Sequence, residues 1–295
     1  MTMLGVVGDL VEDVIVWLGE PVQHGTDSKV EIFHTRGGSG ANVAGFAAAL
    51  HPTRFLGCVG DDHVGRFLVD DLEGKGVDVK VQRRGKSGTI VILIDENGER
   101  TMLPQRGASM LLQDVSDDWI DGLDLLHVPA YFFDGGPLQH TSCDLIRRMK
   151  KRGGLVSVDA SSTGMLQHFG VDPFLDLMAE LGPDFIIANQ TEAALLQLSS
   201  NGVPGDGLAR LPHTIVVAKS GPEPTVVHIP GRERLVVPVP PVDCVRDLTG
   251  AGDAFAAGFL AGYLQTRQLW EACVTGHATA AKVLSSPGAS MAEAA

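Results

Sequence analysis

Short apolar runs bounded by glycine, aspartate or proline recur along this chain, with helical patterns between them. The runs have the length of strands and no apolar–polar alternation, which is typical of strands covered on both faces. They lie at 4–8, 54–60, 125–130, 155–159, 185–189 and 214–219. The helical patterns lie at 41–50, 63–74, 137–151, 173–181, 191–198, 251–264 and 269–284. This order predicts one α/β domain over 1–295, with a doubly wound, mostly parallel sheet flanked by helices. In such sheets ligands bind at the carboxyl ends of the strands.

Two β-rich stretches, about 11–35 and 77–104, interrupt that order. In the second, Asn97-Gly98 stands between two β-rich runs and indicates a hairpin. We expect both stretches to form a small sheet that acts as a lid over the strand ends, and a plain extension of the main sheet is the alternative. An apolar face on such a sheet invites a ligand or a second copy. The sequence therefore predicts a homodimer through the lid.

Composition and charge exclude several classes of protein. The chain has 36 acidic and 23 basic residues and a net charge of −13, so nucleic acid and anionic membranes are poor partners. Its four cysteines are widely spaced and form no CxxC pair, which argues against a zinc site and a disulfide scaffold. No apolar run reaches the ~18 residues of a membrane span, and no basic segment with a cleavage site starts the chain. We expect a cytoplasmic protein with a small-molecule substrate.

The segment DLTGAGDAF (247–255) places an aspartate behind a glycine-rich turn at the start of a small-residue helix. No P-loop pattern is present, and Phe255 stands where a dinucleotide fingerprint needs a third glycine. The backbone N–H groups of Gly250, Ala251 and Gly252 are therefore predicted to form an anion hole, with Asp253 beside it. The alternative is a helix start at which Asp253 only favours the positive end of the macrodipole.

A second glycine-rich turn, GGSGANVAGF (37–46), also opens a helix, and GCVGDDHVG (57–65) follows it. Together with DLTGAGDAF, these segments resemble the two signatures of the ribokinase-like (PfkB) family of sugar and nucleoside kinases. Three further segments are similar to motifs of that family and follow in the same order: NQTE (189–192), VVAKSGPEP (216–224) and HATAAKVLSSPGA (277–289). The resemblance covers nearly the whole chain.

The resemblance implies a role for each part of the DLTGAGDAF turn. Asp253 matches the general base that takes the proton from the acceptor hydroxyl, and the N–H groups of 250–252 meet the charge on the phosphoryl group. We expect a low pKa for Asp253, because it lies at a helix N-terminus. An ionised acceptor still suffices, since the nucleophile loses its proton late in a loose transition state.

The resemblance also implies the ions. Asn189 and Glu192 match a pair that lies near magnesium and the ATP phosphates, often through water, and a helix-capping arrangement of the two is the alternative. Asp247 and Thr249 match residues that help to hold a monovalent cation, potassium in this prediction. Leu248 replaces a common threonine between them, which need not abolish a site built largely from backbone carbonyls.

On the nucleotide side, Lys219 and Gly221 match a Lys-x-Gly motif that borders the ATP. Pro224 stands where a second glycine is usual, so that turn is expected to differ from the family's. His277 lies where many members carry an asparagine near the adenine, and a packed core histidine is the alternative.

On the acceptor side, Asp13, Gly38 and Asn42 match residues that contact sugar hydroxyls, to which carboxylate and amide groups are suited. Ser39 stands where ribokinases themselves carry a lysine. Arg106 is a candidate to reach an acidic group of the substrate, as in the deoxygluconate kinases.

The sequence thus predicts an ATP- and magnesium-dependent kinase that phosphorylates a hydroxymethyl group of a sugar or sugar-like metabolite. Two alternatives stay open: a nucleoside kinase of the same family, and a non-catalytic sugar-binding homologue on the same fold. An NAD-dependent oxidoreductase would need the dinucleotide fingerprint that the chain lacks.

Overall fold

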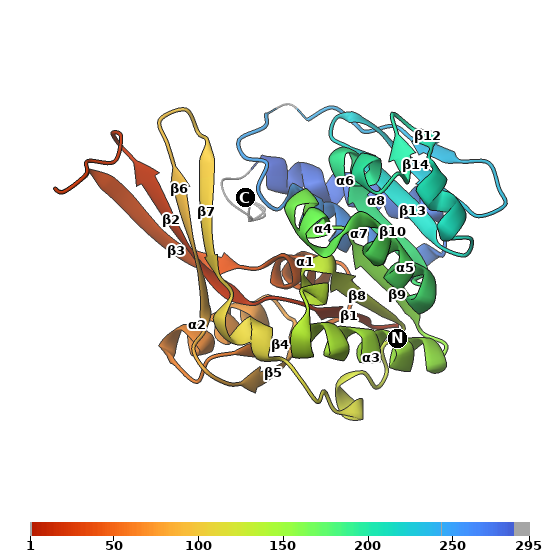
Figure 1. Cartoon of the computed structure of the whole chain (residues 1–295), viewed down its shortest axis with the longest axis horizontal. Helices are drawn as coiled ribbons and strands as arrows, with labels where there is room; N and C mark the ends of the chain where they lie inside the picture. The colour runs from red at the N-terminus through yellow and green to blue at the C-terminus, as the bar shows by residue number, and fades with distance from the viewer. Residues whose placement is uncertain (1, 243, 286–295) are drawn as a thin grey trace.

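A computed structural model describes residues 2–242 and 244–285 (Figure 1). Its centre is a nine-stranded sheet with the strand order β15-β14-β13-β10-β9-β8-β1-β4-β5. The strands are β1 (Leu4–Val7), β4 (Thr53–Val59), β5 (Asp78–Arg83), β8 (Leu125–Pro129), β9 (Leu155–Asp159), β10 (Phe185–Asn189), β13 (Ile215–Ser220), β14 (Glu223–His228) and β15 (Leu235–Val237). The strands from β13 to β5 are parallel, and β14 and β15 are antiparallel. The predicted mostly parallel sheet is confirmed.

Helices cover both faces of this sheet, because its strands bury apolar side chains on both sides. In β10, Ile186 and Ala188 join one apolar cluster, and Phe185 and Ile187 join the other. The first cluster lies under α3 (Gly136–Lys151), α4 (Thr163–Phe169), α5 (Val171–Leu181) and α6 (Gln190–Leu195). The second lies under α1 (Ser39–Ala48), α2 (His63–Gly74), α7 (Ala251–Thr266) and α8 (Leu269–Leu284). None of the helices in the described ranges is long and apolar enough to cross a membrane.

Short elements join these layers. They are the 3-10 helices η1 (Gly107–Leu111), η2 (Asp117–Trp119), η3 (Ala130–Phe133) and η4 (Asp206–Arg210), and the two-stranded ladder of β11 (Ser199–Ser200) and β12 (Val203–Pro204).

A separate four-stranded sheet projects from the main domain (Figure 1, left). Its strand order is β3 (Val30–Gly37), β2 (Val11–Leu18), β6 (Gly88–Ile94) and β7 (Arg100–Gln105). The predicted hairpin joins β6 to β7, and Gly98 adopts a positive φ of 80° in its turn. We call this sheet the small sheet.

The lid boundary predicted at residue 77 was wrong, because β5 belongs to the main sheet. It pairs in parallel with β4, and α2 joins the two strands. A strand–helix–strand unit of this kind places its second strand beside the first in the same sheet. Val79 and Val81 accordingly pack against the apolar cluster under α1 and α7.

Two close approaches of backbone place the start of α1 at the carboxyl end of β1. A Cβ at Gly8 would lie 2.5 Å from the Cα of Gly40, so both positions need glycine. Gly38, with φ 99°, would place a Cβ 2.2 Å from the carbonyl oxygen of Asp9. The second glycine-rich turn therefore brings α1 against the end of the first strand.

Candidate active site

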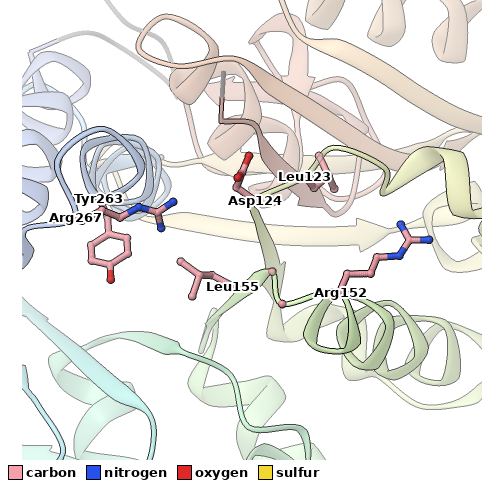
Figure 2. A pocket seen from close by; sticks show the side chains of 8 residues that line it. Leu123, Asp124, Arg152, Leu155, Tyr263 and Arg267 are labelled. Atoms are coloured by element: carbon pink, nitrogen blue, oxygen red, sulfur yellow. The ribbon is translucent and has the colours of Figure 1, made fainter.

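One cavity of about 320 Å³ lies at the amino ends of β8 and β9 (Figure 2). Its lining is Leu123, Asp124, Arg152, Gly153, Gly154, Leu155, Tyr263 and Arg267. None of the predicted site residues is among them, and the Arg152 guanidinium is already bound by Asp117 and Asp121 at 3.0 and 2.6 Å. Asn189 and Lys219 lie instead near the opposite, carboxyl ends of β10 and β13.

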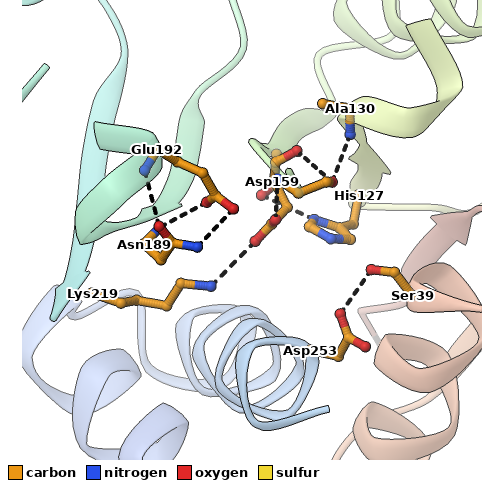
Figure 3. Close-up of polar contacts among 10 residues, drawn as sticks. Ser39, His127, Ala130, Asp159, Asn189, Glu192, Lys219 and Asp253 are labelled. Atoms are coloured by element: carbon orange, nitrogen blue, oxygen red, sulfur yellow. Dashed lines mark hydrogen bonds and ion pairs between the residues drawn. The ribbon is translucent and has the colours of Figure 1, made fainter. Parts of the chain in front are cut away.

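At those carboxyl ends, the two glycine-rich turns meet around Asp253 (Figure 3). α7 begins after Gly250, which adopts a φ of 75°, and Asp253 lies in its first turn. Its carboxylate accepts hydrogen bonds from Ser39 Oγ at 2.7 Å and from Asn42 Nδ2 at 3.0 Å, both on α1. The structure thus joins the start of α7 to the start of α1, although more than 200 residues separate them in the sequence.

A buried arginine orients the Asn42 amide. Arg36 Nη1 donates to Asn42 Oδ1 at 3.0 Å, and Arg36 Nε donates to Asp71 Oδ2 at 2.8 Å. Because the amide oxygen is held by Arg36, the amide nitrogen faces Asp253. Asn42, expected to contact the substrate, instead holds the Asp253 carboxylate. Arg36 and Ser39 are site residues that the sequence did not assign.

Burial raises the pKa of Asp253 to about 6, although the hydrogen bonds from Ser39 and Asn42 lower it. The charge of Asp159 also raises this pKa, and the charge of Lys219 lowers it. The expected low pKa was therefore wrong. Loss of hydration around a carboxylate penalises its charged form more than the helix N-terminus favours it.

Asn189 and Glu192 form a capping box at the start of α6. Asn189 Oδ1 accepts the backbone N–H of Glu192 at 2.9 Å, and Glu192 Oε2 accepts the backbone N–H of Asn189 at 2.8 Å. Asn189 Nδ2 also donates to Glu192 Oε1 at 2.7 Å. The capping alternative is therefore present. These hydrogen bonds leave further lone pairs on both carboxylate oxygens of Glu192, so Glu192 can still contact an ion.

Lys219 lies beside Asn189 in the pairing of β13 with β10. Its ammonium is 3.4 Å from Asp159 Oδ2, and a Cβ built at Gly252 would lie 3.5 Å from it. The predicted anion hole thus has a cation at its edge. Asp159, the last residue of β9, is a further site residue that the motifs did not assign.

The other nucleotide-side residues lie around the β13–β14 turn and α8. Gly221 adopts a φ of 59° in the turn, and Pro224 lies within β14. His277 is buried on α8, where its Nε2 lies 2.8 Å from Thr225 Oγ1 and its ring lies 5.3 Å from the Phe255 ring. Burial lowers the pKa of His277. These contacts are those of the packed-histidine alternative.

A pocket beneath the small sheet lies next to Asp253. Asp13, Thr35, Arg36, Arg100, Asp247 and Thr249 form its polar lining, and Ile15, Ile92, Ile94 and Met102 form its apolar lining. Asp13 Oδ1 is buried and accepts no hydrogen bond from the described residues. Burial raises the pKa of Asp13 to about 6, Arg36 lowers it and Asp253 raises it further. Asp13 therefore lines the pocket with a carboxylate in which one oxygen, packed against Gly37, lacks a hydrogen-bond donor among the described residues.

Arg106 lies in an ion pair within the chain. Its Nε and Nη2 donate to the two oxygens of Asp9 at 2.8 and 3.0 Å, and its Nη1 lies 3.3 Å from Asp134 Oδ2. An acidic substrate group would have to compete with two carboxylates for this guanidinium.

The Asp247 carboxylate is held by the small sheet. Its Oδ1 accepts the backbone N–H and the hydroxyl of Thr249 at 2.8 and 2.7 Å. The same oxygen accepts a hydrogen bond from the Arg100 guanidinium on β7. The position expected to help hold a monovalent cation thus holds a guanidinium.

Comparison with known proteins agrees with this fold. The sequence model of the pfkB family carbohydrate kinases matches residues 1–294. A fructokinase from Klebsiella pneumoniae is 31% identical over 87% of this chain and 83% of its own length. An adenosine kinase from Schizophyllum commune is 27% identical over 84% of this chain and 78% of its own. The crystal structure of a probable sugar kinase from Rhizobium etli CFN 42 superposes with a TM-score of 0.84 at 26% identity, covering 98% of this chain and 94% of that one.

The fold and these relatives define a kinase of ribokinase-like architecture. The chain belongs to the pfkB family of carbohydrate kinases.

Proposed function

We propose that the protein transfers the γ-phosphoryl group of ATP to a hydroxymethyl group of a sugar or sugar-like metabolite. The observation that carries this proposal is the position of Asp253. Its carboxylate lies beside the predicted anion hole, and its charge acts on Asp13, which lines the neighbouring pocket. The name fructokinase among the relatives supports a sugar as acceptor, and adenosine kinase supports a nucleoside as the alternative.

In this mechanism, Asp13 accepts a hydrogen bond from an acceptor hydroxyl and positions the sugar. Asp253 accepts the proton of the hydroxymethyl group that attacks the phosphorus. The N–H groups of Gly250, Ala251 and Gly252 and the ammonium of Lys219 stabilise negative charge on the transferring group. Loss of the proton to Asp253 and loss of ADP from the phosphorus complete the transfer.

Magnesium fits the charges of this site. The carboxylates of Asp159, Glu192 and Asp253 face the single ammonium of Lys219, and ATP adds further negative charge. No group of three or more histidine, cysteine or acidic side chains converges as a metal cage in the part of the chain that the structure describes. Glu192 would hold a magnesium ion together with water and the ATP phosphates, which agrees with both facts, and the ion would neutralise charge on the phosphates.

Potassium fits less well, because the Arg100 guanidinium already lies on Asp247 Oδ1. We therefore derive no step through a monovalent cation. We expect equal rates in potassium and sodium chloride at the same ionic strength, measured as ADP release. A clearly higher rate in potassium would contradict this expectation and support the cation site predicted from the sequence.

The raised pKa of Asp253 predicts an acidic limit to activity. The carboxylate must be ionised to accept a proton, so kcat/KM should fall as the pH drops through about 6. Ser39 donates to the ionised form, so Ser39→Ala should move this limit to higher pH. A pH–rate profile between pH 5 and 8 checks both statements. A rate that is flat down to pH 5 would contradict them.

The outer face of the small sheet predicts a homodimer. Val16 pairs with Ile32 and Leu93, and these side chains point away from the face that lines the pocket. Ile32 is 54% exposed, and Leu103 on β7 is 53% exposed. We expect a dimer at micromolar concentration in sedimentation velocity, and Ile32→Glu should dissociate it. A monomeric parental protein would contradict this prediction.

An acceptor screen tests the proposed function. The protein is incubated with ATP and magnesium and with pentoses, hexoses, keto-deoxy acids or nucleosides, and ADP release is measured. A sugar that gives the highest kcat/KM supports the proposal, and a nucleoside that does so supports the alternative. Binding of a sugar with no ADP release above background would indicate the non-catalytic homologue.

A further inference from the structure

Asp159 ends β9 in the middle of the site, although it belongs to neither glycine-rich signature (Figure 3). One of its oxygens lies 3.4 Å from the Lys219 ammonium, and both side chains are only 14% exposed. Its other oxygen accepts the backbone N–H of Ser161 at 2.8 Å. Both oxygens of the carboxylate are therefore held in a fixed orientation.

The turn after β9 is built around this carboxylate. Ser161 adopts a φ of 64°, a left-handed conformation that a residue with a side chain adopts at a cost. Its hydroxyl donates to the carbonyl of Asp159 and accepts the backbone N–H of Ala130, both at 3.0 Å. Ser162, and not Asp159, caps the following helix α4. Helix capping therefore does not explain why an aspartate stands at this position.

Asp159 and Lys219 have opposite effects on the pKa values of the carboxyl groups on either side of them. Asp159 raises the pKa of Glu192 on the nucleotide side and of Asp253 on the acceptor side, and Lys219 lowers both. The polar and charged groups that face Asp253 are Ser39 and Asn42 from α1, Asp13 from β2, Tyr131 from η3, Asp159 from β9 and Lys219 from β13.

We propose that Asp159 is a positioning residue, which anchors the ammonium of Lys219 at the anion hole and keeps Asp253 a competent proton acceptor by its charge. The part of this proposal that concerns catalysis rests on the proposed function. The electrostatic part concerns the free protein and can be measured without an acceptor.

The direct test is a ¹³C NMR titration of the Asp253 carboxyl carbon in protein labelled at its aspartates, with Asp253→Asn to assign the signal. In Asp159→Asn, the Asp253 midpoint should move to lower pH, because a neighbouring negative charge is lost. Asp184→Asn is the matched control, since Asp184 pairs with Lys150 at 3.0 Å at the other end of β10. It should leave the midpoint unchanged. An Asp253 midpoint that stays in place or rises in Asp159→Asn would overturn the proposal.

Lys219→Met provides a second variant with the opposite sign, which keeps the test decisive if Asp159→Asn does not fold. It should move the Asp253 midpoint to higher pH, because a neighbouring positive charge is lost. A midpoint that falls or stays unchanged would count against the proposal.

Kinetics test the positioning part. Asp159→Asn should lower kcat and move the acidic limit to activity to lower pH. In a protein that already carries Lys219→Met, the same substitution should lower kcat by a factor at least about 3-fold smaller. If parental protein transfers phosphate and Asp159→Asn matches it in kcat and pH profile, the positioning role fails and the proposed function stands. If the midpoints shift as expected but no acceptor is phosphorylated, the proposed function fails and the electrostatic role stands.

Discussion

Asp253→Asn is expected to lower turnover by roughly 10²–10⁴-fold, the range for loss of a positioned general base. The amide keeps the size of the side chain but does not accept the proton of the attacking hydroxyl. ATP affinity should change little, because the backbone donors of Gly250, Ala251 and Gly252 do not depend on that side chain. Turnover, nucleotide affinity and melting temperature of one purified variant give the comparison.

A helix-terminus role for Asp253 predicts a different result. Only about 0.3–1 kcal/mol of stability would then be lost, with turnover nearly intact. Asp172→Asn is the matched control, because Asp172 is an exposed acid in the first turn of α5, away from the site. It should change turnover by less than about 2-fold, since exposed surface substitutions have small effects. An Asp253→Asn protein with near-parental turnover would contradict the assignment of the base.

Removal of magnesium is expected to abolish turnover. Without a divalent cation, the ATP phosphates would meet Asp159, Glu192 and Asp253 with only Lys219 and the N–H groups in compensation. Excess EDTA should bring ADP release to background, and added magnesium should restore it.

The chelation experiment needs a control for unfolding. Circular dichroism of the protein in EDTA should match that of the untreated protein, since no metal cage is present among the described residues. Glu192→Gln should raise the magnesium concentration needed for half-maximal rate. Full turnover in excess EDTA would remove magnesium from the mechanism.

Much of the main sheet could be predicted from the sequence, because parallel strands buried on both faces leave continuous apolar runs. The runs at 125–130, 155–159 and 185–189 correspond to β8, β9 and β10 within one residue. β5 was assigned to the wrong sheet because its mixed apolar and polar pattern resembles that of a half-exposed strand. Its connection to β4 through α2 was the better indication of its place.

The turns of the site could also be predicted, because a glycine-rich turn before a helix constrains the backbone locally. The partners of Asp253 could not. Ser39 and Asn42 reach it only because the folded chain brings α1 against α7. Segments far away in the sequence bury Asp253, and the local sequence around it does not reveal this. For this reason the pKa of Asp253 was expected to be lowered, whereas burial raises it. Asp159 could have been found from one sequence feature, because it is an acidic residue at the carboxyl end of an apolar run.

The central claim is phosphoryl transfer from ATP to the acceptor's own hydroxyl oxygen. ATP labelled with ¹⁸O at its three non-bridging γ-oxygens, incubated with the best acceptor from the screen, tests it by mass spectrometry of the product. The account predicts a phosphorylated acceptor that carries all three labelled oxygens and an unlabelled bridging oxygen. Label recovered only as inorganic phosphate, with the acceptor unchanged, would contradict it.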